Sequence, residues 1–351
     1  MNQEPCGVIL SGGGDDVRRS YEAFFKQGVD WDSSGESPDE PDSLQTTICR
    51  PVNVAGPGTF FGREHRTLKF EPAALPGWWF DRIDQPDSLP IKVSVRNVWT
   101  TVRNIVLRSG SPHNYMRMVE HIIALRLGLG IDNLVIKADS GDPPLFDRGS
   151  LDLVEALENA GRKTQPAPAI YFTVKEAVTM GGENGSFLTL LPARPGDFRL
   201  EMDCAIDFPN AIGKQRIRFV LTRKLFRYGA VARTNTTSAM KCYCRTVGKL
   251  FADIRNLGYT DKNILIAGRR SYLNDPILLH GGKSLEAAWH RSLLDLLAAL
   301  SLVEEGRFVG GVVSFKSGHA LDVEMMRAVC KYGLLQRLGP PEKNPGGAAA
   351  N

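Results

Sequence analysis

The order of strand-like and helix-like segments is the feature that most limits the fold of this chain. Each half offers several strand-like segments first and two helix-like segments late, with no regular strand–helix alternation. This order favours two α+β units over a parallel, doubly wound sheet. The strand-like segments include 65–72, 91–99, 133–138 and 169–174, and the helix-like segments are 115–130, 149–161, 284–300 and 321–335.

Breaks in composition divide the chain. Residues 1–45 form an N-terminal extension that ends in an acidic linker, DSSGESPDEPDS (32–43). Its SGGGDD cluster lacks a phosphate-loop ending, so a flexible or turning N-terminus is the preferred interpretation. The Pro-rich stretch TQPAPA (164–169) separates the two halves. We therefore expect a first domain at 46–163, a second at 168–335 with an insert near 236–280, and a disordered tail at 336–351.

Bulk composition narrows the class of protein. A hydrophobic fraction of 42% and a charged fraction of 23% are typical of a soluble globular chain. The chain shows no apolar run long enough for a transmembrane segment and no signal-peptide pattern, so we expect a cytoplasmic protein. The net charge of +4 is small for 351 residues and argues against general nucleic-acid binding.

Three histidines lie on or beside apolar helical segments. His121 follows Glu120 in VEHIIAL, His290 lies in AWHRSLLDLLAAL, and His319 lies in SFKSGHALD between a strand and a helix. On local context alone, a lone histidine on an apolar helix is more often a core residue than a ligand. Three such histidines with an adjacent carboxylate could also converge on a divalent metal. Spacing alone leaves both interpretations open.

The combination of several motifs is more specific. VEHIIALRLGLGIDNLVIKADSGDPPLFDRGS (119–150) resembles the signature of the zinc-dependent UDP-3-O-acyl-N-acetylglucosamine deacetylases, the family of the committed step of lipid A biosynthesis. Three other segments resemble that family in the same order and extend the resemblance over roughly residues 46–335. They are IDFPNAIGKQRIRF (206–219), ARTNTT (232–237) and FKSGHALDVEMMRAV (315–329).

This resemblance implies a fold and a chemistry. The fold would be two similar domains, each an antiparallel sheet with two helices, with the helix layers packed together in a sandwich. His121 and His290 would bind Zn²⁺, although Fe(II) can occupy sites of this kind. Glu120 would be the general base and His319 the general acid or electrostatic partner. Thr234 would donate to the oxyanion.

The implied substrate is a small acylated nucleotide sugar. The family's reaction hydrolyses the N-acetyl group of UDP-3-O-acyl-N-acetylglucosamine, so the resemblance also implies peripheral contact with a lipid-like substrate. By the same resemblance, Asp147, Lys316 and Asn235 are assigned to substrate binding. Asn235 replaces the family's Phe, and a residue is inserted after Asp147, so a different acylated amine is an alternative substrate.

The family motif H-K-x-x-D is altered in this chain. Arg291 replaces the Lys and keeps a positive charge that could hold an oxyanion or phosphate. The ligand Asp should stand at residue 294, but Leu294 is there and Asp295 comes one place later. A second family Asp falls at Ala298.

The position of Asp295 leaves two alternatives. In a regular helix, position i+4 lies about 40° from i, whereas i+5 lies about 140° away. Either a π-bulge brings Asp295 round to His290, or the third ligand is lost. In the second case the chain could be a non-catalytic binding or regulatory module.

Overall fold

The computed structural model describes residues 6–58, 64–237 and 259–341. Within these ranges the fold is a set of sheets with helices between them, and the predicted α+β class is confirmed. The part of the predicted insert at 238–258 and the tail at 342–351 lie outside the described residues.

A five-stranded sheet forms most of the first half. Its order is β4-β5-β11-β6-β7, with α3 (Leu151–Ala160) packed against β4. A smaller sheet, β10-β9-β8, lies between β7 and β11 along the chain. The strands are β4 (Val52–Pro57), β5 (His65–Pro72), β6 (Trp78–Arg82), β7 (Ile91–Lys92), β8 (Val98–Thr100), β9 (Val106–Arg108), β10 (Tyr115–Met116) and β11 (Leu134–Ala138).

A seven-stranded sheet forms the second large layer, with the order β1-β14-β15-β23-β16-β17-β2. Its strands are β1 (Val8–Ser11), β2 (Trp31–Ser33), β14 (Val178–Gly181), β15 (Phe187–Leu191), β16 (Leu200–Phe208), β17 (Gly213–Val220) and β23 (Gly310–Phe315). Smaller pairings complete the described structure. They involve β3 (Leu44–Ile48) with β12 (Arg162–Pro168), β13 (Tyr171–Val174) with β22 (Arg307–Phe308) and β24 (Leu335–Leu338), β18 (Thr234–Thr237) with β19 (Ile264–Ala267), and β20 (Leu279–His280) with β21 (Lys283–Ser284). Short helical turns lie at η1 (Val95–Asn97) and η2 (Glu183–Gly185).

Both large sheets are mixed, so the prediction of purely antiparallel sheets is wrong. β11 lies parallel to β6, and β23 lies parallel to β16. In each case a helix lies in the connection, and a crossover that returns the chain in the same direction gives a parallel neighbour. α2 (Glu120–Gly128) lies between β6 and β11, and the helices near residues 286–300 lie between β16 and β23.

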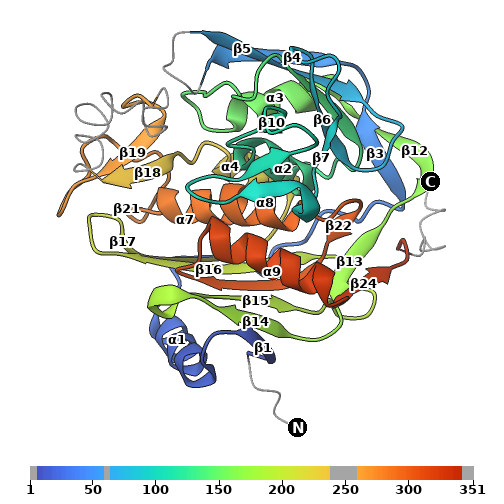
Figure 1. The fold of residues 1–351 in the computed structure, drawn as a ribbon. Coiled ribbons are helices and arrows are strands. Elements are labelled where there is room, and N and C mark those ends of the chain that lie inside the picture. The colour runs from blue at the N-terminus through green and yellow to red at the C-terminus, as the bar shows by residue number, and fades with distance from the viewer. Residues whose placement is uncertain (1–5, 59–63, 238–258, 342–351) are drawn as a thin grey trace, which may run out of the picture.

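The central helices lie between the two large sheets (Figure 1). They are α2, α4 (Arg223–Gly229), a helix made of α7 (Glu286–His290), η3 (Arg291–Leu296) and α8 (Leu297–Leu300), and α9 (His319–Lys331). α2 packs against η3 and α8, and α8 packs against α9. One continuous apolar core includes side chains of both sheets and these helices.

Glycines of the GLGIDN motif allow this close packing. A Cβ on Gly128 would lie 2.4 Å from the ring of Phe226 in α4, so only glycine lets the two helices approach so closely. Gly130 has φ +63°, a left-handed conformation that favours glycine and ends the helix. The motif therefore fixes where α2 sits and where its first residue, Glu120, is placed.

The N-terminal extension is part of the fold. Of the two expectations for its glycine cluster, flexible or turning, the structure has a turn between a strand and a helix. β1 and β2 occupy the two edges of the seven-stranded sheet. α1 (Gly14–Lys26) covers the face opposite α9 (Figure 1). Its apolar residues recur at helical spacing and pack on the rings of Phe187 and Phe315; they are Val17, Tyr21 and Phe24. Likewise, residues 336–338 belong to β24 and pair with β13, so the predicted tail begins too early.

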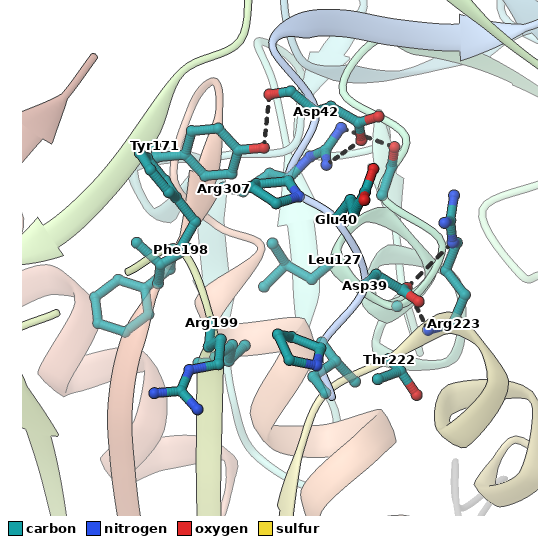
Figure 2. Close-up of a pocket in the computed structure, with 18 of the residues that line it drawn as sticks. Asp39, Glu40, Asp42, Leu127, Tyr171, Phe198, Arg199, Thr222, Arg223 and Arg307 are labelled. Carbon is teal, nitrogen blue, oxygen red and sulfur yellow. Dashed lines mark hydrogen bonds and ion pairs between the residues drawn. The ribbon is translucent and has the colours of Figure 1, made fainter. Parts of the chain in front are cut away.

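The acidic linker is tethered to the body by ion pairs. Residues 38–42, here called the acidic strap, border a cavity of about 90 Å³ (Figure 2). Asp42 accepts hydrogen bonds from Arg307 at 2.7 Å and from Arg162 at 2.5 Å. Asp39 accepts from Arg223 at 3.1 Å. The ion pairs of Asp42 and Asp39 therefore hold the linker against the body of the protein.

We predict that Asp42→Asn lowers the free energy of unfolding by about 2 kcal/mol at pH 7, because it removes one of the two carboxylates, Asp42 and Asp132, that pair with the buried guanidinium of Arg307. Burial opposes ionisation of Asp42, but Arg307 and Arg162 outweigh it and lower its pKa. A lowered folded-state pKa stabilises the fold above the unfolded pKa of about 3.9, and this contribution is lost as the pH falls through the folded value. Urea unfolding at pH 7 and at pH 3 measures the effect. The matched control Asp39→Asn removes an exposed pair and should change stability by no more than about 0.5 kcal/mol.

Candidate active site

A π-turn resolves the unusual spacing in AWHRSLLDLLAAL. The helix is regular up to His290, but residues Arg291–Leu296 form a π-helix before regular geometry resumes. A π-turn accommodates one extra residue, so Asp295 stays on the same side of the helix as His290. The Oδ2 atom of Asp295 lies 3.5 Å from His290 Nδ1, and its Oδ1 atom lies 3.6 Å from His319 Nε2. Of the two alternatives that the spacing left open, the structure has the bulged helix.

Two of the predicted histidines face each other across Thr234. His121 is the second residue of α2, and Thr234 is the first residue of β18. The Thr234 hydroxyl lies 3.3 Å from His121 Nε2 and 3.0 Å from His290 Nε2. Ser150, the residue before α3, donates to the carbonyl oxygen of His121 at 3.0 Å. Residues that are distant in sequence thus meet at one point.

Glu120 and His319 complete the cluster, and the surroundings raise the pKa of both side chains. Glu120 is buried, and its Oε2 atom accepts a hydrogen bond from the Ile105 amide at 3.1 Å. Burial raises the pKa of Glu120, partly offset by His319. Burial alone would lower the pKa of His319, but Asp295 and Glu120 outweigh it and raise that pKa. A carboxylate with a raised pKa beside an imidazole that holds its proton is an arrangement suited to acid–base chemistry.

Arg291 has protein partners that the sequence did not indicate. Its Nη2 atom donates to Ser317 Oγ at 2.7 Å and to Asp322 Oδ1 at 2.6 Å, and all three residues are buried. These partners flank His319 along the chain. The sequence led us to expect that Arg291 binds an oxyanion or phosphate. In the structure its Nη2 atom instead contacts the turn that carries His319.

The three residues assigned to substrate binding occupy different surroundings. Lys316 lies in the turn between β23 and α9, with its Nζ atom 5.4 Å from the ring centroid of Phe315. Asn235 follows Thr234 in β18, so its side chain points to the opposite face of that strand. Asp147 is exposed in the loop before α3. Only Asn235 is adjacent in sequence to a member of the cluster.

Sequence reasoning missed two members of the cluster, Tyr259 and Asp322. The Tyr259 hydroxyl hydrogen-bonds with Thr234, and burial together with nearby Glu120 raises the pKa of the phenol. Tyr259 belongs to the long insert and has no motif around it, so no sequence signal could have found it. Asp322 can be found in the sequence as the third residue after His319, but the sequence does not show that it pairs with Arg291.

We predict that Tyr259→Phe lowers the rate constant of an acid–base reaction at this cluster by about tenfold, since a lost neutral hydrogen bond changes a free energy by about 1 kcal/mol. The fold should be retained because the ring remains. Steady-state kinetics with melting temperatures measure both quantities. An unchanged rate constant would place the Tyr259 hydroxyl outside the reaction.

The donor types of the cluster suit zinc, which binds imidazole nitrogen and carboxylate oxygen. Burial and the neighbouring His290 lower the pKa of His121 to about 3, so this imidazole is neutral, as a ligand must be. The buried Oδ1 atom of Asp295 has no hydrogen-bond partner. Among the described residues, no group of three His, Cys, Asp or Glu side chains already stands at metal-binding distances. Metal binding would therefore require side-chain rotations, including that of the Thr234 hydroxyl that lies near both Nε2 atoms.

A comparison with protein-family models decides the family. Residues 45–331 match the model described as LpxC: UDP-3-O-acyl N-acetylglycosamine deacetylase. The chain belongs to this family.

Curated relatives agree with this family assignment. The chain is similar to UDP-3-O-acyl-N-acetylglucosamine deacetylases of Brucella ovis, Brucella canis and Brucella melitensis. Each is 27% identical over 290 residues, which covers 82% of this chain and 95% of the relative. The resemblance inferred from the motifs is confirmed, and the low identity fits a divergent member. No helix within the described ranges is both long enough and apolar enough to cross a membrane.

Proposed function

We propose that the protein hydrolyses the N-acetyl group of an acylated UDP-amino sugar in a metal-dependent reaction. The observation that carries this proposal is the π-turn, which brings Asp295 to His290 and His319 beside the Glu120–His121 pair. In a regular helix Asp295 would lie about 140° round from His290 and could not share a metal ion with it. The family membership supports deacetylation as the reaction.

In this proposal His121, His290 and Asp295 hold a zinc ion, although Fe(II) could take the same ligands. A bound zinc ion supplies polarisation of the acetamide carbonyl and a lower pKa for water. Support comes from the types of these side chains and from the unpartnered Oδ1 atom of Asp295. The two-domain sandwich and the cytoplasmic location belong to the same proposal and stay predictions.

The side chains of this protein would carry the proton transfers. Glu120 removes a proton from the attacking water, and its raised pKa makes it a stronger base than an exposed carboxylate. Thr234 and Tyr259 lie together and donate hydrogen bonds to the carbonyl oxygen as it becomes negative. His319 gives a proton to the amine nitrogen as the C–N bond breaks. Acetate and a free 2-amino sugar are the products.

The cavity beside the cluster supports the proposal that the enzyme cleaves off a small acyl group. His121 and Thr234 border a small apolar cavity, and the other residues that line it include Met118, Ile122, Pro144, Phe146 and Leu153. An apolar cavity accommodates a methyl or methylene group in preference to a charged one. Asp147, Lys316 and Asn235 remain the proposed contacts to the rest of the substrate.

A different acylated amine is the second candidate substrate. The polar Asn235 stands next to Thr234 where the family motif has an aromatic residue, and such an exchange alters what the neighbouring surface can bind. The same proton transfers would apply. Only the group attached to the amine would differ.

A substrate series tests the proposed function. Purified protein is supplied with UDP-3-O-acyl-N-acetylglucosamine, UDP-N-acetylglucosamine without the acyl chain, and simple N-acetylated amines, and acetate release is measured by mass spectrometry. We expect the acylated UDP-sugar to be cleaved with the highest kcat/KM. Preference for another amine would support the second candidate, and absence of acetate from every substrate would contradict both.

A further inference from the structure

The turn that carries His319 is held in an uncommon backbone conformation. Lys316 has φ +54°, a left-handed conformation that a lysine rarely adopts. Gly318 is extended, and His319 is the first residue of α9. A non-glycine residue with positive φ raises the energy of the turn and persists only where surrounding contacts hold it. Those contacts therefore determine where His319 is placed.

Arg291 makes the contacts on both sides of His319. One nitrogen, Nη2, donates to Ser317 Oγ before the histidine and to Asp322 Oδ1 after it. Ser317 Oγ in turn hydrogen-bonds with Ser314 Oγ in β23 at 2.7 Å. Asp322 is fully buried, and the side chain of Arg291 is only 7% exposed. The guanidinium thus links the π-turn, the end of β23 and the first turn of α9.

The hydrogen bonds of the His319 ring itself do not determine its position. Its Nδ1 atom is buried without a hydrogen-bond partner. Its Nε2 atom lies 3.6 Å from Asp295, beyond the range of a strong hydrogen bond. The placement of the imidazole therefore follows from the backbone that carries it.

The Arg291–Asp322 pair also leaves some of its buried polar atoms without hydrogen bonds. Arg291 Nε and Nη1 and Asp322 Oδ2 are buried without hydrogen-bond partners. A pair selected only for stability would satisfy these atoms, because a buried unpaired polar atom destabilises a fold. Such groups call for an explanation other than stability.

We propose that Arg291 and Asp322 form a positioning clamp that fixes His319 over the Glu120–Asp295 cluster. The clamp consists of Arg291, Asp322 and Ser317. It rests on the proposed function, in which His319 supplies a proton, and it assigns no contact with substrate to Arg291 or Asp322. Both act on the reaction through the placement of His319, and a displacement of a reacting group by about 1 Å can lower a rate about 100-fold.

Charge-conserving and charge-removing variants test the clamp. Arg291→Lys keeps the charge but cannot bridge Ser317 and Asp322 with one planar group, and Asp322→Asn keeps the shape but removes the carboxylate. We expect each to lower kcat about 10- to 100-fold while KM changes less than about threefold. The matched control is Asp203→Asn, which removes a largely buried carboxylate from its two hydrogen bonds with Arg216. It should lower the melting temperature with kcat unchanged.

A double variant separates positioning from stability. Arg291→Gln with Asp322→Asn removes both buried charges, so the melting temperature should recover relative to either single charge-removing variant. The clamp predicts that kcat stays low in the double variant, because no group then bridges Ser317 and residue 322. Recovery of kcat together with the melting temperature, or unchanged kcat in all folded variants, would overturn the clamp.

Amide hydrogen exchange tests the clamp without relying on the proposed function. The Lys316 amide donates to the Ala205 carbonyl at 2.9 Å, so its exchange rate reports on the turn. In the Arg291→Lys protein we expect exchange at residues 316–319 to accelerate at least about tenfold, with β16 unchanged. If the wild-type protein releases no acetate, the proposed function fails while this measurement still decides the clamp; equal exchange in both proteins would refute it.

Discussion

Replacement of Glu120 by glutamine should lower the rate constant for acetate release by about 10²- to 10⁴-fold, the usual contribution of a general base. The Ile105 amide can still donate to the glutamine carbonyl oxygen, so the local structure should remain. Burial raises the pKa of Glu120, which means that the ionised carboxylate is destabilised in this site. The Glu120→Gln protein should therefore melt at the same temperature as the wild type or higher.

Single-turnover kinetics, melting temperature and metal content measured on one sample test this prediction. The combination matters because a loss of activity with a loss of metal would indicate a damaged site, not a missing base. Glu120→Asp is the matched control, since it keeps a carboxylate but shortens its reach, and we expect an intermediate rate. A Glu120→Gln protein with wild-type kinetics would show that another group takes the proton.

Replacement of Asp295 by alanine should weaken zinc binding at least about 100-fold, because removal of even an outer partner of a metal site commonly weakens binding 10- to 100-fold. Asp295 lies within 3.6 Å of both His290 and His319, which makes it the proposed carboxylate ligand. Equilibrium titration with zinc measures the affinity directly.

Asp322→Asn serves as the control for the metal prediction, because this buried carboxylate contacts Arg291 and not the two histidines. It should bind zinc as tightly as the wild type. Equal zinc affinity for the Asp295→Ala protein and the wild type would mean that the π-turn has no role in metal binding, and it would favour a non-catalytic module.

Local patterns predicted the class of fold but not all of its connections. The order of strands and helices was enough for an α+β fold. The same patterns did not show that β11 returns parallel to β6, since strand direction depends on long-range pairing. α1 was missed because its apolar residues, Val17, Tyr21 and Phe24, are separated by charged ones and gain stability only against Phe187 and Phe315.

The sequence predicted those residues of the candidate site that stand in contiguous motifs. It did not predict contacts between residues that are distant in the sequence. Glu120, His121 and His319 follow from short signatures in the sequence. The spacing of His290 and Asp295 posed the right question, but a π-turn and a lost ligand have the same sequence, and only the helix geometry separates them. The contacts of Arg291 with Asp322 and of Tyr259 with Thr234 join residues more than 20 positions apart, so no local pattern could indicate them.

Metal removal and reconstitution tests the central claim most directly. Acetate release from UDP-3-O-acyl-N-acetylglucosamine is measured for metal-stripped protein and for the same protein with one equivalent of zinc. The account predicts no activity above background without metal, recovery with zinc, and no recovery in the Asp295→Ala protein at that zinc concentration. Full activity of the stripped protein, or no acetate release after reconstitution, would contradict it.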